Sequence, residues 1–320
     1  MSEQDDSDKN EFNETQYVSR QRTGCKTFPG SARVMTRERS VTFRFSRSRR
    51  LPYIRAIFLT SFSLVPDDYR LITFLRGCKF SLEKCKRKLD MYFTMRTAIP
   101  EFFNNRDITS PEMREVTKVV QVPPLPGLTK NGRRVIVMRG INKDLPTPNV
   151  TEAMKLVLMI GDVRLKEEQV GVAGDVYILD ASVATPSHFA KFTPAIVKKF
   201  LICVQEAYPV KLKEVHVVNV SPLVDTIVNF VKPFLKEKIR NRIFMHSDMK
   251  TLYEYIPKEI LPTEYGGDAG PIQAIHGAYI QTLLSEKWLE KDRKQWENEN
   301  QWRADHRERE GGREGGEGGR

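Results

Sequence analysis

Five histidines are the first residues in this sequence that could do chemistry, as metal ligands or as general bases. No two of them have the His-x-x-x-His spacing that aims two imidazoles at one metal ion. Ser187 and His188 follow Asp180 and have the residue types of a hydrolytic triad, but no Gly-x-Ser-x-Gly elbow precedes them. The sequence also has neither a Gly-x-x-x-x-Gly-Lys phosphate loop nor a dinucleotide fingerprint. We therefore expect no enzyme, no metal and no cofactor.

A second set of residues could bind phosphate or another anion, and it consists of Lys211, Lys213, Lys238 and Arg242. Lys211 and Lys213 are two residues apart in an extended segment, which puts both ammonium groups on the same side. Lys238 and Arg242 follow Val231 by seven and eleven residues and so continue the apolar period of a predicted helix. The formal net charge of the chain, +11, also favours an anionic partner.

The helix that carries these last two cations is predicted from Ser221 to Arg242. Ser221 is placed to cap it, and Pro222 takes the first helical position, where a missing N–H costs nothing. Its apolar stripe consists of Leu223, Val224, Ile227, Val228, Val231, Phe234 and Leu235. Two interpretations stay open. The helix is either packed in the core, with cations that complement its dipole, or a movable gate whose stripe closes a lipid cavity while its cations meet phosphates.

Strands and helices alternate in the part of the chain that positions these residues. Periodicity predicts strands at 134–138, 176–179 and 215–218, and helices at 151–168, 194–206 and 222–242. The dipeptide Asn131-Gly132 is a tight-turn signal before the first of these strands. The predicted fold class is α/β, a mainly parallel sheet with covering helices and a gate helix over a hydrophobic cavity, preceded by a small all-helical domain.

Composition sets the two ends of the chain apart from this core. The 320 residues are 40% hydrophobic, which is enough for a buried core. Residues 1–65 are Arg/Ser-rich without periodicity and residues 311–320 are Gly-rich, so we expect both segments to be disordered. The Arg-rich segment lacks zinc ligands and an ordered basic helix, so no nucleic-acid partner is expected. The four scattered cysteines and the acidic, polar N-terminus favour a reducing, cytoplasmic setting without a signal peptide.

Four motifs occur in a fixed order between Phe74 and Gly267. They are Phe74-Leu75-Arg76 with Lys79-Phe80, Ala207-Tyr208-Pro209, Lys232-Pro233-Phe234-Leu235, and Leu261-Pro262-Thr263-Glu264-Tyr265-Gly266-Gly267. In this order they resemble the CRAL-TRIO lipid-transfer family, in its branch of α-tocopherol transfer protein-like proteins, cellular retinaldehyde-binding proteins and clavesins. The resemblance covers residues 66–285. It implies an N-terminal helical domain at 66–110, a lipid-binding domain at 111–270 and a C-terminal helix at 271–310, and residues 1–65 are atypical for the family.

The resemblance also implies two binding regions. A phosphoinositide headgroup would be bound by Lys211, Lys213, Lys238 and Arg242, beside a gate helix that includes Val224, Ile227, Val228 and Val231. A further arginine of the family's headgroup site matches Cys78 here, and the neighbouring Lys79 is a candidate substitute. The hydrophobic ligand pocket would be formed by Met154, Val157, Gly161, Leu179, Phe200, Cys203 and Val204. Val157 and Gly161 match hydroxyl-bearing pocket residues of α-tocopherol transfer protein, so tocopherol itself is not carried over as the ligand.

The function implied by the resemblance is lipid transfer. The protein would bind a small hydrophobic lipid (a retinoid, a tocopherol or a similar molecule) in a closed cavity and move it between membranes, with phosphatidylinositol bisphosphate opening the gate. The alternative is a vesicle-trafficking adaptor that transfers nothing, is recruited by phosphoinositides, and contacts a partner through the polar helix around Trp288, Trp296 and Trp302. In both cases we expect a cytoplasmic protein that associates peripherally with endosomal or vesicle membranes.

Overall fold

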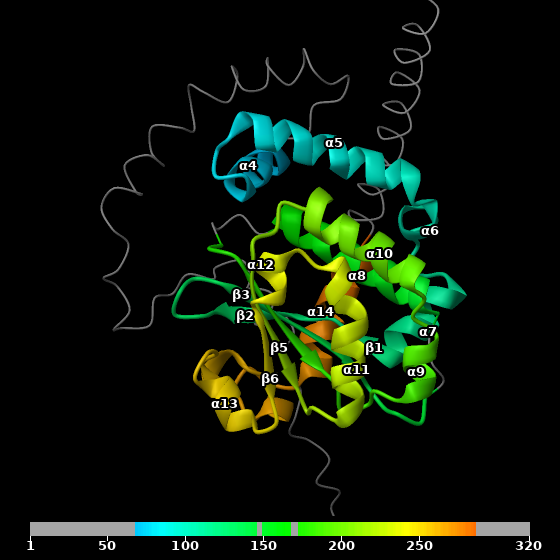
Figure 1. Cartoon of the computed structure of the whole chain (residues 1–320), viewed down its shortest axis with the longest axis vertical. Coiled ribbons are helices and arrows are strands. Elements are labelled where there is room, and N and C mark those ends of the chain that lie inside the picture. Colours follow the sequence, from blue (N-terminus) through cyan, green and yellow to red (C-terminus); the bar gives the residue numbers. More distant parts are fainter. Residues whose placement is uncertain (1–67, 146–148, 168–171, 286–320) are drawn as a thin grey trace, which may run out of the picture.

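A six-stranded sheet lies at the centre of the fold, with helices on both of its faces (Figure 1). The computed structural model describes residues 68–145, 149–167 and 172–285. The strands are β1 Val120–Gln121, β2 Pro124–Leu128, β3 Arg134–Gly140, β4 Asp175–Asp180, β5 Leu212–Val218 and β6 Ile243–His246. Their order is β1-β3-β4-β5-β6, and β2 also pairs with β3. Strands β3 to β6 run parallel, which confirms the predicted mainly parallel α/β sheet.

A small helical unit precedes the sheet, as predicted, and its first two helices lie across the top of Figure 1. Its helices are α4 Asp68–Gly77, α5 Leu82–Ala98, α6 Pro100–Phe103 and α7 Pro111–Val119. The Ser81 hydroxyl accepts a hydrogen bond from the Lys84 amide at 3.4 Å and so caps α5. Ser81, a residue type that favours N-cap positions, therefore marks the start of α5.

The remaining helices connect the parallel strands or follow the last one. They are α8 Val150–Glu167, α9 Pro186–Ala190, α10 Pro194–Ile202, the π-helical turn η1 Cys203–Ala207, α11 Pro222–Val231, the 3₁₀ turn η2 Lys232–Phe234, α12 Glu237–Arg240, α13 Met249–Tyr253, the 3₁₀ turns η3 Lys258–Ile260 and η4 Thr263–Tyr265, and α14 Ile272–Leu284. Gly132 has a φ of +68° in the turn between β2 and β3, the left-handed conformation that glycine adopts most readily. The turn predicted at Asn131-Gly132 is thus confirmed.

Alternate residues of the strands face two different apolar layers. Val135, Val137, Val176 and Ile178 belong to the layer on which α13 and α14 pack. Ile136, Met138 and Tyr177 belong to the opposite layer, on which α7 and α8 pack. The sheet is therefore buried on both faces, as expected for parallel strands joined by crossover helices.

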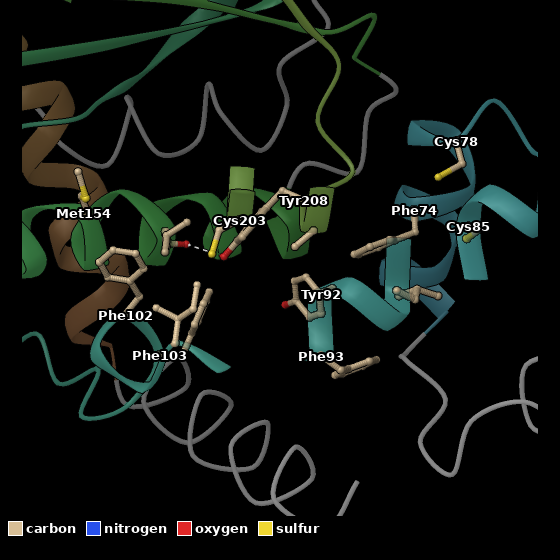
Figure 2. Packing of buried hydrophobic residues seen from close by; sticks show 14 of the residues in the cluster. Phe74, Cys78, Cys85, Tyr92, Phe93, Phe102, Phe103, Met154, Cys203 and Tyr208 are labelled. Carbon is tan, nitrogen blue, oxygen red and sulfur yellow. Dashed lines mark hydrogen bonds between the residues drawn. The ribbon is translucent and has the colours of Figure 1, made fainter. Parts of the chain in front are cut away.

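The helical unit packs against α8 and η1 through buried hydrophobic side chains, some of which are drawn in Figure 2, and through charged side chains. The Tyr92 ring on α5 meets the Tyr208 ring edge-on, with 5.7 Å between ring centroids. The Asp162 carboxylate on α8 pairs with the Arg96 and Arg106 guanidinium groups, each at 2.8 Å. This cluster fixes α5 against the α/β part of the chain.

The prediction of a single helix over Ser221–Arg242 is wrong. Helix α11 ends at Val231, η2 adds one 3₁₀ turn, and Leu235 is extended with φ −93° and ψ 139° before α12 begins. Pro233 explains the break, because its ring lacks an N–H and clashes with the carbonyl four residues earlier in an α-helix. Ser221 stands at the N-cap of α11, but its side chain makes no capping hydrogen bond. The four predicted gate residues all lie on α11.

The predictions for the two ends of the chain concern residues that the structure does not describe. The disordered ends expected at 1–65 and 311–320 lie outside the described residues, as do Trp288, Trp296 and Trp302 of the expected C-terminal helix. Within the described ranges, every helix is too short or too polar to cross a bilayer.

Candidate functional site

A group of five cations surrounds the start of β5, and we call it the cation cluster. Burial lowers the pKa of Lys213 below its ordinary value, and four neighbouring cations lower it further: Arg133, Arg242, Lys238 and Lys79. Repulsion of this kind acts over short distances, so each of the four cations lies near Lys213. The chain thus brings together side chains from the α4–α5 corner, the β2–β3 turn, β5 and α12. Cations held this way are suited to an anion with several phosphates.

The backbone at the start of the parallel strands positions this cluster. Arg133, Lys213 and Arg242 lie at or just before the starts of β3, β5 and β6, and parallel strands begin at one common edge of a sheet. Gly174, just before β4, leaves room for Lys213, because a Cβ there would stand 2.6 Å from Lys213 Cγ. The Arg242 guanidinium also donates to the Leu212 carbonyl, which ties the start of β6 to β5.

Lys211 lies two residues before Lys213 and close to the corner of the helical unit. The hydrogen bond from Cys85 is the main cause that holds the pKa of Cys78 below its ordinary value, and the Lys211 ammonium adds to it. Cys78 is itself buried, so it presents no side chain to an external ligand in the way that an arginine at this position would. Lys79, next to it, belongs to the cation cluster.

Two of the predicted headgroup residues, Lys238 and Arg242, are therefore neighbours of Lys213, but not for the reason that the helical period suggested. Lys238 lies on α12 and Arg242 follows it, beyond the break at Pro233. Arg133 was missed by the sequence reasoning; its guanidinium pairs with the Glu214 carboxylate beside Lys213. The signal that could have found it is its place in front of β3, at the edge where β5 also begins.

An apolar surface occupies one side of the sheet below α11. Strand register pairs Leu179 with Val217 and Val217 with Met245, and alternation puts all three on the face of Tyr177. Helix α11 lies on the same side, because its Val231 packs against the cluster formed by α5, α8 and α10. Met245 remains 39% exposed. The predicted gate helix and the predicted pocket residue Leu179 thus share one side of the sheet.

A cavity of about 120 Å³ lies between α4, α8, β4 and the segment from Val204 to Lys211. Three predicted pocket residues line it, namely Val157, Gly161 and Val204. Of the other four, Met154 and Cys203 are buried in the helical core cluster, Phe200 packs against that cluster, and Leu179 lies on the sheet. Lys211 also lines the cavity, so the cavity reaches the first predicted headgroup residue.

Two histidines pair on the opposite face of the sheet, away from α11. His216 Nδ1 lies 2.9 Å from His246 Nε2, and His246 Nδ1 lies 2.7 Å from the Thr251 hydroxyl. Both rings are buried beside Phe244 and Tyr255. Within the described ranges, no group of three or more His, Cys, Asp or Glu side chains could hold a metal ion. The two histidine rings are packed and hydrogen-bonded in the core of the protein.

Buried histidines make folding stability depend on pH. Burial lowers the pKa of His216 and of His276 to about 4, so both are neutral in the folded protein and take up protons more readily once unfolded. We expect the unfolding free energy to fall as the pH drops from 6.5 to 4. His276→Leu should reduce this slope by up to about 1.4 kcal/mol per pH unit. Urea unfolding at several pH values measures it, and an unchanged slope would contradict the assignment.

Comparisons with known proteins agree with this architecture. A CRAL/TRIO domain model matches residues 120–267, and a model described as Pinta-like, UBA domain matches residues 63–113. The alpha-tocopherol transfer protein-like protein of Homo sapiens is 33% identical over 207 residues, which cover 64% of this chain and 60% of that protein. Clavesin-2 of Rattus norvegicus is 29% identical over 223 residues, which cover 69% of this chain and 68% of that protein.

Among solved structures, the crystal structure of Sfh5 aligns with this chain at 15% sequence identity and a TM-score of 0.48. The alignment covers 70% of this chain and 81% of the Sfh5 chain. The chain spans 60% of the length of the alpha-tocopherol transfer protein-like relatives that it matches. Both family matches fall on the elements described above, the UBA match on the helical unit and the longer match on the sheet with its crossover helices. Residues 120–267 therefore match a CRAL/TRIO domain, the family that the ordered motifs resemble, and residues 63–113 match a Pinta-like UBA domain.

Proposed function

We propose that this protein binds a hydrophobic lipid between α11 and the sheet and transfers it between membranes, and that a phosphoinositide headgroup on the cation cluster opens α11. The observation that carries the proposal is that the cation cluster and the apolar helix α11 are joined by a short stretch of chain. Lys238 of the cation cluster lies seven residues after Val231, the last residue of the apolar helix α11. An anion that binds Lys238 therefore pulls on the segment that directly follows α11 in the chain.

The connection between α11 and α12 has the properties of a hinge. It is held to η1 by Gln205, whose Nε2 donates to the Phe234 carbonyl at 3.0 Å and whose Oε1 accepts from the Lys236 amide at 3.0 Å. An ion pair between Lys236 and Glu206 adds to this contact. Ordinary hydrogen bonds of this kind contribute about 1 kcal/mol each, and each lysine at an anionic surface gains about 1 kcal/mol. Headgroup binding can therefore offset the opening of the hinge.

A coupled gate also solves a thermodynamic problem of lipid transfer. Burial of a lipid chain is worth about 0.8 kcal/mol per methylene, and a bilayer offers nearly the same gain. A closed pocket consequently cannot take a lipid from a membrane, or return it, by hydrophobicity alone. The cavity of about 120 Å³ is also smaller than the several hundred Å³ typical of ligand sites. Because α4, α8 and β4 line this cavity and α11 does not, a long lipid needs a second space, and α11 can provide one by moving away from the sheet.

The test begins with the bound molecule. Native mass spectrometry of the full chain, purified from its own cells, should show one lipid per protein, and extraction should identify it. Transfer of that lipid between vesicles should then be faster when the acceptor contains phosphatidylinositol bisphosphate. Equal rates with and without this lipid would contradict headgroup gating. Because Val157 and Gly161 carry no hydroxyl, we do not expect tocopherol to be the preferred ligand.

A second function, a membrane adaptor that transfers nothing, draws on the same observations. Recruitment by the cation cluster requires no internal lipid, and a cavity of about 120 Å³ is compatible with an empty protein. The adaptor predicts vesicle binding that depends on phosphoinositide, together with no stoichiometric lipid in the native mass spectrum. We propose peripheral association with endosomal or vesicle membranes for either function.

A further inference from the structure

Phe80 is the most exposed of the large hydrophobic side chains in the described part of the chain. It is 54% exposed at the corner between α4 and α5, whereas the next one, Tyr255, is 41% exposed. A single exposed apolar residue is ordinary on a protein surface. The backbone and the neighbours of Phe80 are what give it significance.

The backbone holds Phe80 in an uncommon conformation. Lys79 and Phe80 have φ values of 55° and 61°, in the left-handed region that residues with a Cβ adopt at a cost. The Phe80 amide donates to the Leu75 carbonyl at 2.7 Å and the Ser81 amide to the Cys78 carbonyl at 3.1 Å. These are the bonds that close the end of a helix, and Ser81 then caps α5. The corner is thus fixed from both sides and presents the Phe80 ring outward.

The same corner is joined to the cation cluster. Lys79 is one of the cations that lower the pKa of Lys213. Gly77, at the end of α4, approaches the chain so closely that a Cβ there would stand 2.3 Å from the Pro209 carbonyl oxygen, two residues before Lys211. The exposed aromatic ring therefore lies on the same part of the surface as the cations. Cations beside an exposed apolar ring are typical of proteins that lie on an anionic bilayer.

We propose that Phe80 is the anchor of a membrane-docking surface, formed with Lys79, Lys213 and Lys238, and that its ring enters the interfacial region of an anionic phospholipid bilayer. The cations bring the surface to the lipid headgroups, and the ring adds an apolar contact that water cannot offer. A headgroup in solution would meet only the cations. This inference rests on the proposed phosphoinositide binding and adds to it a residue that contacts the bilayer itself.

The first test is Phe80→Asn in the full chain. Asparagine tolerates the left-handed conformation, so the corner is expected to keep its fold and thermal stability. Co-sedimentation with phosphatidylcholine vesicles that contain phosphatidylinositol bisphosphate should become about tenfold weaker. Binding of soluble inositol trisphosphate, measured by calorimetry, should remain unchanged. Leu284→Asn is the matched control, because Leu284 is 38% exposed at the end of α14 and lies outside the cation cluster.

A second measurement reports on insertion directly. In Phe80→Trp, vesicle lipids brominated in their acyl chains should quench fluorescence more strongly than in the unsubstituted protein, whose own tryptophans supply the background. Unchanged vesicle binding of Phe80→Asn together with no added quenching would overturn the anchor and leave headgroup binding intact. If the unsubstituted protein binds neither the vesicles nor inositol trisphosphate, the proposed function itself fails. The two failures are therefore distinguishable.

Discussion

Replacing Asp162 with alanine is expected to lower the unfolding free energy by about 3–5 kcal/mol, the largest stability loss that we predict for this chain. The Asp162 carboxylate is 3% exposed and accepts hydrogen bonds from Arg96 at 2.8 and 3.0 Å and from Arg106 at 2.8 Å. The Arg96 side chain is 1% exposed. Removal of the carboxylate would leave two buried guanidinium groups without their shared anion.

The ionisation of Asp162 also makes the unfolding free energy depend on pH, which gives a second way to detect its contribution to stability. Burial acts to raise the pKa of Asp162, but the Arg96 and Arg106 guanidinium groups hold it well below its ordinary value of 3.8. The pKa of the Asp162 carboxyl is lower in the folded protein than in the unfolded protein, so its ionised form stabilises the folded state at any pH above the pKa of the unfolded protein. This stabilisation is lost as the pH falls toward the pKa of the folded protein. We expect the loss below pH 4, separate from the histidine effect between pH 6.5 and 4. In Asp162→Ala the loss below pH 4 should be reduced.

Urea unfolding of the full chain measures this prediction. The control is Glu115→Ala, because the Glu115–Lys118 ion pair is 67% exposed on both sides and such pairs contribute less than about 1 kcal/mol. A loss below about 1 kcal/mol for Asp162→Ala would contradict the role of the carboxylate as a shared counter-ion. The cluster also holds α5 against α8, so the variant is expected to loosen the helical unit that carries Lys79 and Phe80.

The architecture was predictable because local patterns determine it. The strand at 176–179 and the helix at 151–168 follow from periodicity and length, and the structure places β4 at Asp175–Asp180 and α8 at Val150–Glu167. Ser81 caps α5 as its residue type suggests. Alternation of strands and crossover helices then leaves few topologies other than a parallel sheet.

The site was predictable only in part, because it depends on residues far apart in the chain. Lys238 and Arg242 were singled out, but the helical period that joined them to Val231 fails at Pro233. Arg133 meets Lys213 across 80 residues of sequence, which no local pattern reveals. The pairing of Asp162 with Arg96 likewise joins α8 to α5 with a separation of 66 residues. Such contacts arise from tertiary packing, so the spacing of residues along the sequence does not predict them.

Lys213→Ala combined with Lys238→Ala is expected to weaken binding to phosphoinositide vesicles about 30-fold, the largest functional effect that we predict. Each lysine near an anionic surface contributes about 1 kcal/mol, and two together correspond to this factor. The matched control is Lys143→Ala with Lys250→Ala, which removes the same charge from exposed lysines outside the cation cluster. Higher salt should reduce the difference between the two variants, because exposed charges are screened.

The lowered pKa of Lys213 gives this prediction an independent check. Burial and its four cationic neighbours favour the neutral amine, so Lys213 loses its proton at a lower pH than an ordinary lysine. A phosphate headgroup on the cluster would favour the charged form and raise this pKa again, which makes binding take up protons at alkaline pH. Vesicle affinity should therefore decline as the pH rises toward the pKa of Lys213, and the decline should be absent from Lys213→Ala. Equal binding by the double variant and its control would show that anionic membranes meet another surface of this protein.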